Sequence, residues 1–509
     1  MVEGGRTRKE LGDAVTRAES LARASAQPWD IVVIGGGATG AGVAVDAATR
    51  GYSVLLLEQH DFGKGTSSRS TKLVHGGVRY LERGDVRLVT EALRERSRLL
   101  ANAPHLVRVQ PFIVPAYRWW DAPYFFAGLS LYDLLAGRSP FGRSKYLNRR
   151  EVLRQLPTIR AEGLRGGILY YDGQFDDARL LIDLIQTAVK NGATCLNYAR
   201  IVRLLHDGDR VTGVAFTDAE TGTTAEVSAR VVVNATGAFC DSIRTLADPA
   251  ARPMVTPSQG AHLVFDRSFL PGNAAMVVPK TPDGRVLFAI PWHGRTLVGT
   301  TDVPVPTTEL EPRATEAEID FILETAGRYL AKTPTRADVL SVFAGIRPLV
   351  KADGGTNTAA LSRDHTIRTE AGLLTVTGGK WTTYRNMAED AVNRAAELAG
   401  LPPKPCRTAN LRITGPIASG SVVPLHPQLP YTEADIVRAV RHEMARTVED
   451  VLSRRLRALI LDADAAVEMA PRVAALMAAE LGRDAAWEAE QVRAFTALAR
   501  GYQLRRESA

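Results

Sequence analysis

The sequence predicts an α/β protein of three parts: a nucleotide-binding domain with a parallel sheet, a domain with an antiparallel sheet, and a C-terminal helical region. Three observations support this expectation. Residues 30–58 have a strand, glycine turn, helix and strand pattern, residues 260–350 hold several short strand patterns, and after residue 400 glycine gives way to alanine and arginine. At 509 residues the chain is long enough for two or three domains with a large core.

The first unit reads as a βαβ motif. DIVVI (30–34) and SVLLLE (53–58) are apolar strands, and VAVDAATR (43–50) between them has a helical pattern. The turn after the first strand is glycine-rich, and a carboxylate, Glu58, ends the second strand. In that position a carboxylate accepts hydrogen bonds from a ribose.

Three glycines of this turn, Gly35, Gly37 and Gly40, have the G-x-G-x-x-G spacing. The first permits a tight turn, the second lets the backbone approach a pyrophosphate, and the third lets helix and strand pack closely. Amides at the helix start then face the anion. Alone the motif would be weak evidence, but its place between a strand and a helix predicts dinucleotide binding.

Later segments predict the remaining helices and strands of the three parts. Residues 174–237 read as a helix followed by strands, and residues 260–350 as short strands with one helix near 315–331, which is typical of an antiparallel sheet. Residues 373–400 read as strand, glycine turn and helix. Residues 432–462 have an amphipathic helical pattern. We expect residues 1–29 to be a short, partly helical tail without the apolar core of a secretory signal.

Composition and net charge limit the kinds of binding partner that we expect. No apolar run reaches eighteen residues, so no membrane-spanning helix is expected. The three cysteines, Cys195, Cys240 and Cys406, are far apart and form neither a disulfide framework nor a metal motif, which favours a reducing, cytoplasmic location and no metal. The net charge of +7 suits anionic small molecules or an anionic lipid surface. Nucleic acid is disfavoured because no nucleic-acid motif is present.

The pattern favours a flavin dinucleotide over a nicotinamide dinucleotide. The glycine motif occurs once, and the second strand is followed by DFGKGTSSRSTKLVHGG (61–77) rather than by another short βα unit. A late strand ends in NATG (234–237), which returns the chain beside the dinucleotide. TGGKWTTYR (377–385) places a helix start after a glycine turn, where its positive end and Lys380 would meet the negative charge of a reduced flavin.

With these motifs, the sequence resembles the FAD-dependent (aerobic, respiratory) glycerol-3-phosphate dehydrogenases of the glutathione-reductase-like, D-amino-acid-oxidase-type flavoprotein group. TSSRSTKLVHGGVRYLE (66–82) and GGKWTTYR (378–385) carry most of the resemblance, which covers roughly residues 30–400. It implies a discontinuous FAD-binding domain over 30–105, 171–240 and 351–400. It also implies a substrate domain over 106–170 and 241–350, and a helical domain over 401–509.

The resemblance also implies an activity and partners. The expected reaction is oxidation of sn-glycerol 3-phosphate to dihydroxyacetone phosphate, with FAD taking the hydride from C2 and a membrane quinone taking the electrons. It implies a homodimer that lies peripherally on the inner, cytoplasmic face of the cell membrane. Expected cofactor-binding residues are Gly35, Gly37, Gly40, Glu58, Thr66, Ser67, Ser68, His75, Gly76, Gly77, Ala235, Thr236, Gly237, Gly379, Lys380, Thr382 and Thr383.

A phosphate dianion needs charged donors, and arginine forks fit it best. The candidates for substrate binding are Arg79, Tyr80, Arg347, Arg363 and Lys380. Each has a structural alternative: Arg363 adjoins Asp364 and would form a local ion pair, and Arg347 precedes a proline and would hold a loop.

The residues expected to be catalytic are His262 and Arg347. Histidine has the most suitable pKa for a base, and a guanidinium does not readily lose its proton. The resemblance implies a histidine at a strand start in the substrate domain, so the expected base is His262. The alternative for His262 is a hydrogen-bonded strand residue, and His75 has a structural alternative as well.

The segment 116–138 is rich in aromatic residues and includes Trp119, Trp120, Phe125 and Phe126. It would suit a membrane interface, with Arg118, Arg138 and the arginines of the C-terminal region near headgroups, or else a domain core beside a solvated helix. Competing functions are an oxidase that uses oxygen, an amino-acid oxidase or dehydrogenase, and a flavin-binding subunit without turnover.

Overall fold

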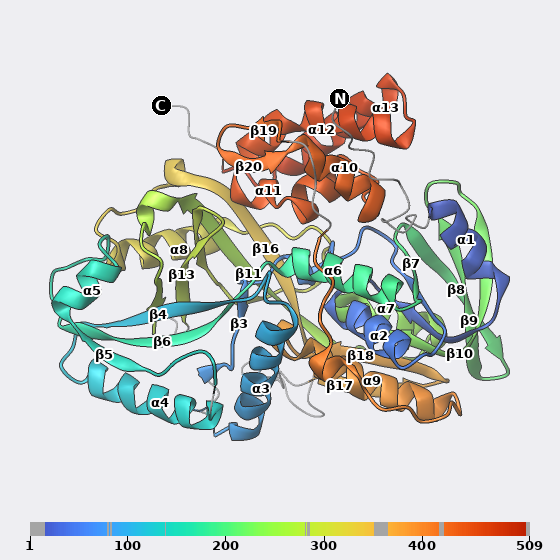
Figure 1. Cartoon of the computed structure of the whole chain (residues 1–509), viewed down its shortest axis with the longest axis horizontal. Coiled ribbons are helices and arrows are strands. Elements are labelled where there is room, and N and C mark those ends of the chain that lie inside the picture. Colours follow the sequence, from blue (N-terminus) through green and yellow to red (C-terminus); the bar gives the residue numbers. More distant parts are fainter. Residues whose placement is uncertain are drawn as a thin grey trace, which may run out of the picture.

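A computed structural model describes residues 16–78, 81, 84–137, 139–279, 281, 286–350, 365–416 and 422–504. Within them the chain forms two large sheets and a helical region (Figure 1). The fold class predicted from the sequence is confirmed.

The first sheet has a parallel centre. β1 (Trp29–Ile34) pairs in parallel with β2 (Val54–Leu57) on one side and with β10 (Thr224–Asn234) on the other. The strand order is β17–β18–β10–β1–β2–β7, where the remaining strands are β7 (Thr194–Leu196), β17 (His365–Glu370) and β18 (Leu373–Gly378). Residues of β1 and β2 are buried nearly throughout, because helices and strands cover both faces of a parallel sheet.

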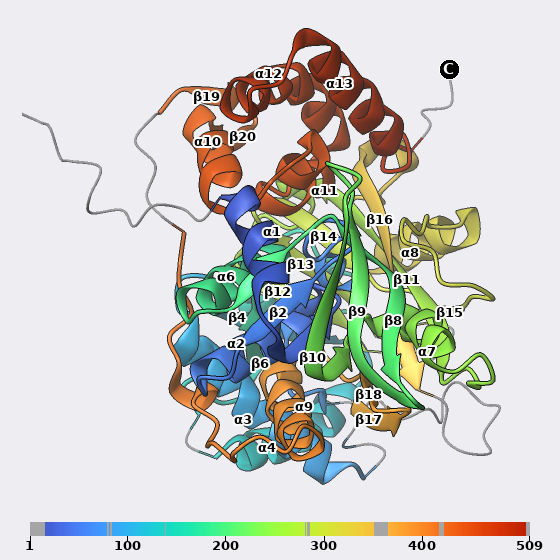
Figure 2. The ribbon, with the colours of Figure 1, turned by 90° about the vertical axis from the view of Figure 1, so that its right-hand side faces the viewer.

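Helices and a meander complete this unit. α2 (Ala38–Thr49) packs between α6 (Asp177–Lys190) and α9 (Tyr384–Leu398). β8 (Ala199–Asp207) and β9 (Arg210–Asp218) extend antiparallel from β10 as a long ribbon (Figure 2). α1 (Arg17–Ala26), in the region expected to be a tail, packs beside β7. α7 (Cys240–Ala247) packs against β18, β10 and β8, and α3 (Val86–Asn102) contacts α4 (Asp121–Ala136) and the turn before α9.

The second sheet has ten strands in the described residues. Its main path is β15–β11–β14–β13–β12–β4–β6–β3, with β16 paired to β11 and β5 to β6. All pairs are antiparallel except β4 with β12, so the expected antiparallel sheet contains one parallel pair. The bounds are β3 (Leu73–Val74), β4 (Arg108–Ala116), β5 (Lys145–Asn148), β6 (Gly166–Gln174), β11 (Val255–Asp266), β12 (Ala275–Val278), β13 (Leu287–Trp292), β14 (Arg295–Gly299), β15 (Val303–Pro304) and β16 (Val339–Val350).

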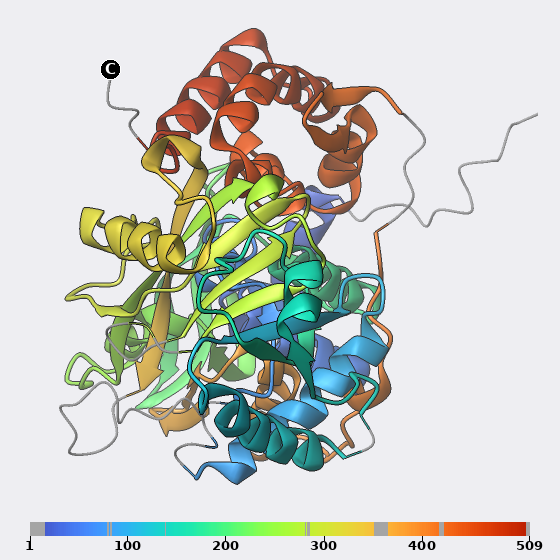
Figure 3. The same ribbon diagram turned by 90° about the vertical axis from the view of Figure 1, so that its left-hand side faces the viewer.

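Helices cover this second sheet. α8 (Glu316–Tyr329) is the helix expected near residues 315–331, and its apolar side packs on the sheet with Ile319 and Ile322. α5 (Arg149–Gln155) follows β5. α4 (Asp121–Ala136) lies beneath β4 and β6 at the end of the molecule opposite the C-terminal helices (Figure 3).

The C-terminal region sits above both sheets (Figures 1 and 3). It contains α10 (Glu433–His442), the π-helical turn η9 (Asp450–Arg455), α11 (Ala458–Leu461), α12 (Ala463–Leu481) and α13 (Ala485–Ala499), with a hairpin of β19 (Pro424–His426) and β20 (Leu429–Thr432). Residues 432–462 were expected to be helical and are helical in three pieces. Met444 and Arg457 interrupt them in left-handed conformations, with φ of +56° and +68°.

Candidate functional site

The glycine turn after β1 is packed too tightly for any side chain. Gly35 has φ of +104°, and a Cβ added there would lie 2.8 Å from the carbonyl oxygen of Ala235. A Cβ on Gly40 would lie 1.9 Å from the carbonyl oxygen of Gly35. Only glycine therefore lets β1, the end of β10 and the start of α2 meet, which is the arrangement of a dinucleotide-binding turn.

Glu58 lies just beyond the end of β2 and lines the same cavity. Its carboxylate accepts hydrogen bonds from the amide of Gly36 at 2.7 Å and from the amide of His60 at 2.9 Å. Burial nevertheless raises the pKa of this carboxyl above its ordinary value. Hydrogen-bond donors from a ribose would favour the charged form, so Glu58 suits a dinucleotide.

The segment that follows lines the cavity and connects the nucleotide-binding unit to the second sheet. Ser67 Oγ accepts a hydrogen bond from the amide of Ala38 at 2.9 Å, at the start of α2. Thr66 Oγ1 donates to the carbonyl of Ile346 in β16 at 2.6 Å. The indole of Trp381 donates to the carbonyl of Ser67 at 2.8 Å. Residues 66–72, which we call the bridging loop, are thus tied to the start of α2, to β16 of the second sheet and to the turn before α9.

The glycine turn before α9 forms another wall of the cavity. Gly378 and Gly379 have φ of +81° and +71°, and Gly379, Lys380 and Thr382 line the cavity. The amide of His75 donates to Thr382 Oγ1 at 3.1 Å. The two most specific sequence motifs therefore lie side by side, although three hundred residues separate them in the chain.

His262 on β11 and Arg347 on the neighbouring strand β16 both line the cavity, on the same side of the second sheet. Gly260 and His262 are two residues apart, so they point to the same side of the strand. The guanidinium of Arg347 covers Gly260 on that side and is held by Thr300 Oγ1 and by the carbonyl of Thr301, both at 3.0 Å. Asp302 pairs with the same guanidinium at 3.2 Å. A cation and an imidazole thus face one space.

His262 is held in a fixed orientation. Its ring stacks on Phe343 with centroids 4.8 Å apart, and its Nε2 lies 3.0 Å from Thr71 Oγ1 in the bridging loop. In the described part of the chain, its Nδ1 has no hydrogen-bond partner. Burial, with the charges of Lys72 and Arg347, lowers the pKa of His262 well below its ordinary value. The ring is therefore neutral at neutral pH and competent to accept a proton.

Most residues that the sequence predicts for the site are brought together. Those lining the cavity are Gly35, Gly37, Glu58, Thr66, Ser67, His75, Ala235, Thr236, Gly237, His262, Arg347, Gly379, Lys380 and Thr382. Gly40 packs the turn from behind, and Ser68, Gly76, Gly77 and Thr383 are buried without lining the cavity. Arg79, Tyr80 and Arg363 lie outside the described residues.

Sequence reasoning missed several residues of this site. Thr71 touches His262, Trp381 ties the bridging loop to α9, and Thr300 holds Arg347. Thr71 and Trp381 lie in the two motifs 66–82 and 378–385, so motif membership was the available signal for them. The partners of all three residues are 191, 314 and 47 residues away, however, and only the fold reveals them.

Comparison with known proteins agrees with this architecture. A family described as FAD dependent oxidoreductase matches residues 30–385, and the C-terminal domain of alpha-glycerophosphate oxidase matches residues 406–488. The fold and site thus define a flavoprotein oxidoreductase. The mitochondrial glycerol-3-phosphate dehydrogenase of Arabidopsis thaliana is 40% identical, covering 93% of this chain and 87% of that protein. The human mitochondrial enzyme is 38% identical, over 96% and 76%.

A solved structure agrees as well. The glycerol-3-phosphate dehydrogenase of Bacillus halodurans, complexed with FAD, superposes with a TM-score of 0.77 at 29% identity, covering 98% of this chain and 99% of that one. The chain belongs to the FAD-dependent glycerol-3-phosphate dehydrogenase family. The glycine cradle and the Glu58 acceptor fit FAD, the cofactor of this family.

Proposed function

We propose that this chain oxidises sn-glycerol 3-phosphate to dihydroxyacetone phosphate and passes the electrons to a membrane quinone. The observation that carries the proposal is that His262 on β11 and Arg347 on the neighbouring strand β16 both line the dinucleotide cavity. When bound, FAD supplies the two-electron acceptor that oxidation of a secondary alcohol requires.

His262 is the proposed base for the hydroxyl proton at C2. It is neutral at neutral pH, and its position is fixed by Phe343 and Thr71. A low pKa makes imidazole a weak base, but a bound phosphate dianion would add negative charge nearby and favour the protonated ring. A substrate that carries a phosphate would therefore make His262 a stronger base.

Arg347 is the proposed anchor for the substrate phosphate, with Lys380 as a second cation on the cavity wall. Guanidinium pairs with phosphate in a fixed, forked geometry, and Thr300 and Asp302 hold this fork in place. Arg79, Tyr80 and Arg363 stay predictions for the same role.

The test is an anaerobic titration of the purified holoprotein with sn-glycerol 3-phosphate while the flavin absorbance is followed. Bleaching of the flavin band, with sn-glycerol 1-phosphate as the stereochemical control, is the expected result. An oxidised flavin that persists with glycerol 3-phosphate and bleaches with an amino acid would overturn the substrate. A flavin that no substrate bleaches would indicate a flavin-binding subunit without turnover.

A quinone acceptor requires contact with lipid, and we propose that α4 makes it. No helix in the described ranges is long and apolar enough to cross a bilayer. α4 and the turn before it, however, expose large apolar side chains: Trp119, Trp120, Tyr124, Phe126, Leu131 and Leu134. Aromatic and apolar side chains on one helix are typical of interfacial attachment. Arg118 is exposed and lies over the Trp120 ring, where it would meet anionic headgroups. Arg138, expected in the same role, lies outside the described residues.

The inner side of the same helix touches the flavin region. Tyr132 is buried, and its hydroxyl accepts a hydrogen bond from the amide of Gly76 at 2.8 Å. Gly76 follows His75, which lines the cavity. A quinone in the lipid beneath α4 would therefore approach the site by a short route.

Three of the C-terminal arginines that the sequence suggested for headgroup contact are not available for that role. Arg454, Arg455 and Arg457 are buried in ion pairs. The C-terminal helices also lie at the opposite end of the molecule from α4 (Figures 1 and 3). Attachment at the inner face of the cell membrane and a homodimer stay predictions from the family resemblance.

The alternative acceptor is oxygen, as in an oxidase. Reoxidation of the substrate-reduced protein separates the two acceptors. Fast reoxidation by a soluble quinone with slow reoxidation by air supports the quinone, and rapid peroxide formation in air supports the oxidase.

A further inference from the structure

The carbonyl oxygen of Ser68, in the bridging loop, accepts hydrogen bonds from two buried cations. Lys72 Nζ donates to it at 2.9 Å, and Arg457 Nη2, from the C-terminal region, donates at 2.6 Å. Both side chains are almost completely buried. Arg457 is 389 residues from Ser68 in the chain, so the C-terminal region contributes directly to the conformation of this loop.

Asp177, the first residue of α6, joins the two cations. Its carboxylate lies 2.7 Å from Lys72 Nζ and 2.9 Å from Arg457 Nη2, and it also accepts hydrogen bonds from the amide and hydroxyl of Ser70. Burial lowers the pKa of Lys72 to about 7, and the charge of Arg457 acts in the same direction. A cluster with this electrostatic cost is better explained by the geometry it imposes than by stability.

The backbone at both cations supports the same interpretation. Lys72 and Arg457 have φ of +65° and +68°, which non-glycine residues seldom adopt. Two such conformations meet at one carbonyl oxygen. Unfavourable backbone conformations of this kind cluster at functional sites, where the surrounding structure maintains them.

The bridging loop contacts the proposed base His262 directly and also through Phe343. Thr71, next to Lys72, contacts His262 Nε2 through its hydroxyl at 3.0 Å. Lys72 Nζ also lies 5.1 Å from the centre of the Phe343 ring, on which His262 stacks. The position of His262 therefore depends on where residues 68–72 are held.

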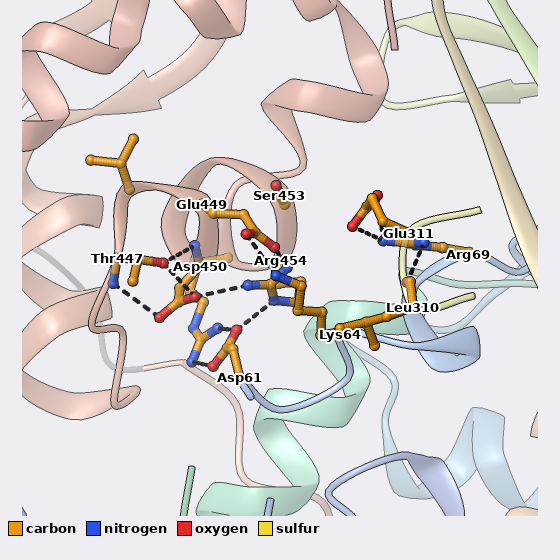
Figure 4. Close-up of polar contacts among 12 residues, drawn as sticks. Asp61, Lys64, Arg69, Leu310, Glu311, Thr447, Glu449, Asp450, Ser453 and Arg454 are labelled. Atoms are coloured by element: carbon orange, nitrogen blue, oxygen red, sulfur yellow. Dashed lines mark hydrogen bonds and ion pairs between the residues drawn. The ribbon is translucent and has the colours of Figure 1, made fainter. Parts of the chain in front are cut away.

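The C-terminal region also forms ion pairs with Asp61 and Lys64, just before the bridging loop. Arg454 and Arg455 both pair with the buried Asp61, and Arg454 also pairs with Glu449 and Asp450 (Figure 4). Lys64 pairs with Glu449 at 2.8 Å. Residues 61–72 are thus anchored at both ends by the segment 449–457.

We propose that Arg457 is a positioning residue for His262, so that the C-terminal region completes the catalytic site through the bridging loop. Arg457 fixes the Ser68 carbonyl and Asp177, these fix Lys72 and Thr71, and Thr71 orients the imidazole. The inference rests on the proposed role of His262. It goes beyond that role by assigning the C-terminal region a part in the chemistry.

The test compares the rate of flavin reduction per bound FAD at saturating sn-glycerol 3-phosphate in stopped flow. We expect Arg457→Gln to slow it by roughly tenfold or more, since small misplacements of reacting groups cost up to about 100-fold. The apparent Kd for substrate should change little because Arg347 is untouched. Arg457→Lys, which keeps the charge, should recover part of the rate.

Thr71→Val removes only the hydroxyl that meets His262 and provides a second variant if Arg457→Gln does not fold. It should slow reduction by a comparable factor. Arg472→Gln, which breaks an exposed ion pair with Glu433 in the same region, is the matched control and should behave as wild type. A purely structural role for Arg457 would lower FAD content or the melting temperature while the rate per bound FAD stays within twofold of wild type.

A rate per bound FAD within twofold of wild type in Arg457→Gln, or an unchanged rate in Thr71→Val, would overturn the proposal. A wild-type flavin that glycerol 3-phosphate fails to reduce would instead overturn the proposed function.

Discussion

Gly260 and Arg347 occupy adjoining space: a Cβ built on Gly260 would lie 2.3 Å from Arg347 Nη2. The glycine pairs with Gly345 across β11 and β16, two residues before Arg347 on the partner strand. The guanidinium folds back over this gap and reaches Thr300 and Thr301. The absence of a side chain at 260 thus sets the position of the proposed phosphate anchor.

Gly260→Ala should displace Arg347 and weaken substrate binding with little loss of FAD. One charge-assisted hydrogen bond contributes about 1.5–3 kcal/mol, so kcat/KM should fall by roughly 10- to 100-fold. Steady-state kinetics and the FAD content of the purified variant are the measurements. Gly128→Ala in α4, where no atom lies within 4 Å of the added Cβ, is the matched control. Unchanged kinetics in Gly260→Ala would contradict the arrangement.

Arg347→Met should act through the phosphate group of the substrate. We expect a fall of about 100-fold or more in kcat/KM for glycerol 3-phosphate, because a charged partner of the phosphate is lost. Turnover of glycerol, which has no phosphate, should change far less. An equal loss for both substrates would show that Arg347 acts on the reacting atoms and not on the phosphate.

His262→Gln should lower kcat by about 100- to 10,000-fold, the range of general-base catalysis, while FAD remains bound. The base works as the neutral ring, so activity is lost as pH falls through its pKa. Since that pKa is lowered, the acid limb of the wild-type kcat/KM profile should lie well below pH 6.5. An acid limb at or above pH 6.5, or near-normal turnover in the variant, would exclude His262 as the base.

Glu58 should make FAD affinity depend on pH. The ionised carboxylate accepts hydrogen bonds from the ribose hydroxyls, and the protonated carboxyl is a weaker acceptor. The affinity for FAD should therefore fall as the pH drops through the pKa of Glu58. Burial raises that pKa, so the loss should begin at a higher pH than an ordinary carboxyl would give. FAD release measured by fluorescence between neutral and acid pH is the assay. Glu58→Gln should bind FAD more weakly and with a flatter pH dependence, and an unchanged dependence would contradict this role.

The exposed side of α4 should bind lipid. Wild-type holoprotein is expected to sediment with anionic liposomes at low salt, and less so at high salt because headgroup attraction is screened. Trp119→Ser with Leu134→Ser should abolish most of this binding while soluble-quinone activity persists, since both side chains are more than 70% exposed. Val422→Ser, an exposed apolar change in the C-terminal region, is the control. Equal sedimentation of the double variant and wild type would exclude α4 as the attachment surface.

The local elements of the fold were largely predictable from the sequence. The βαβ unit at 30–58, the helix near 315–331 and the strand, turn and helix at 373–400 all appear where the patterns indicate. Each depends on neighbours close in the chain, through hydrophobic period, glycine turns and short strands. The parallel pairing of β4 with β12 and the breaks at Met444 and Arg457 were not predicted, because long-range packing decides them.

The sequence alone determined the flavoprotein class, the glycine cradle and Glu58 through residue type and spacing, and the family resemblance of its motifs supplied the candidates His262 and Arg347. Only the tertiary structure decided how these groups are held. Thr71 and Phe343 orient His262, Gly260 makes room for Arg347, and the C-terminal arginines turn inward to Asp61 and Asp177. The physical reason is that burial and pairing depend on contacts between segments tens to hundreds of residues apart, which no local pattern records.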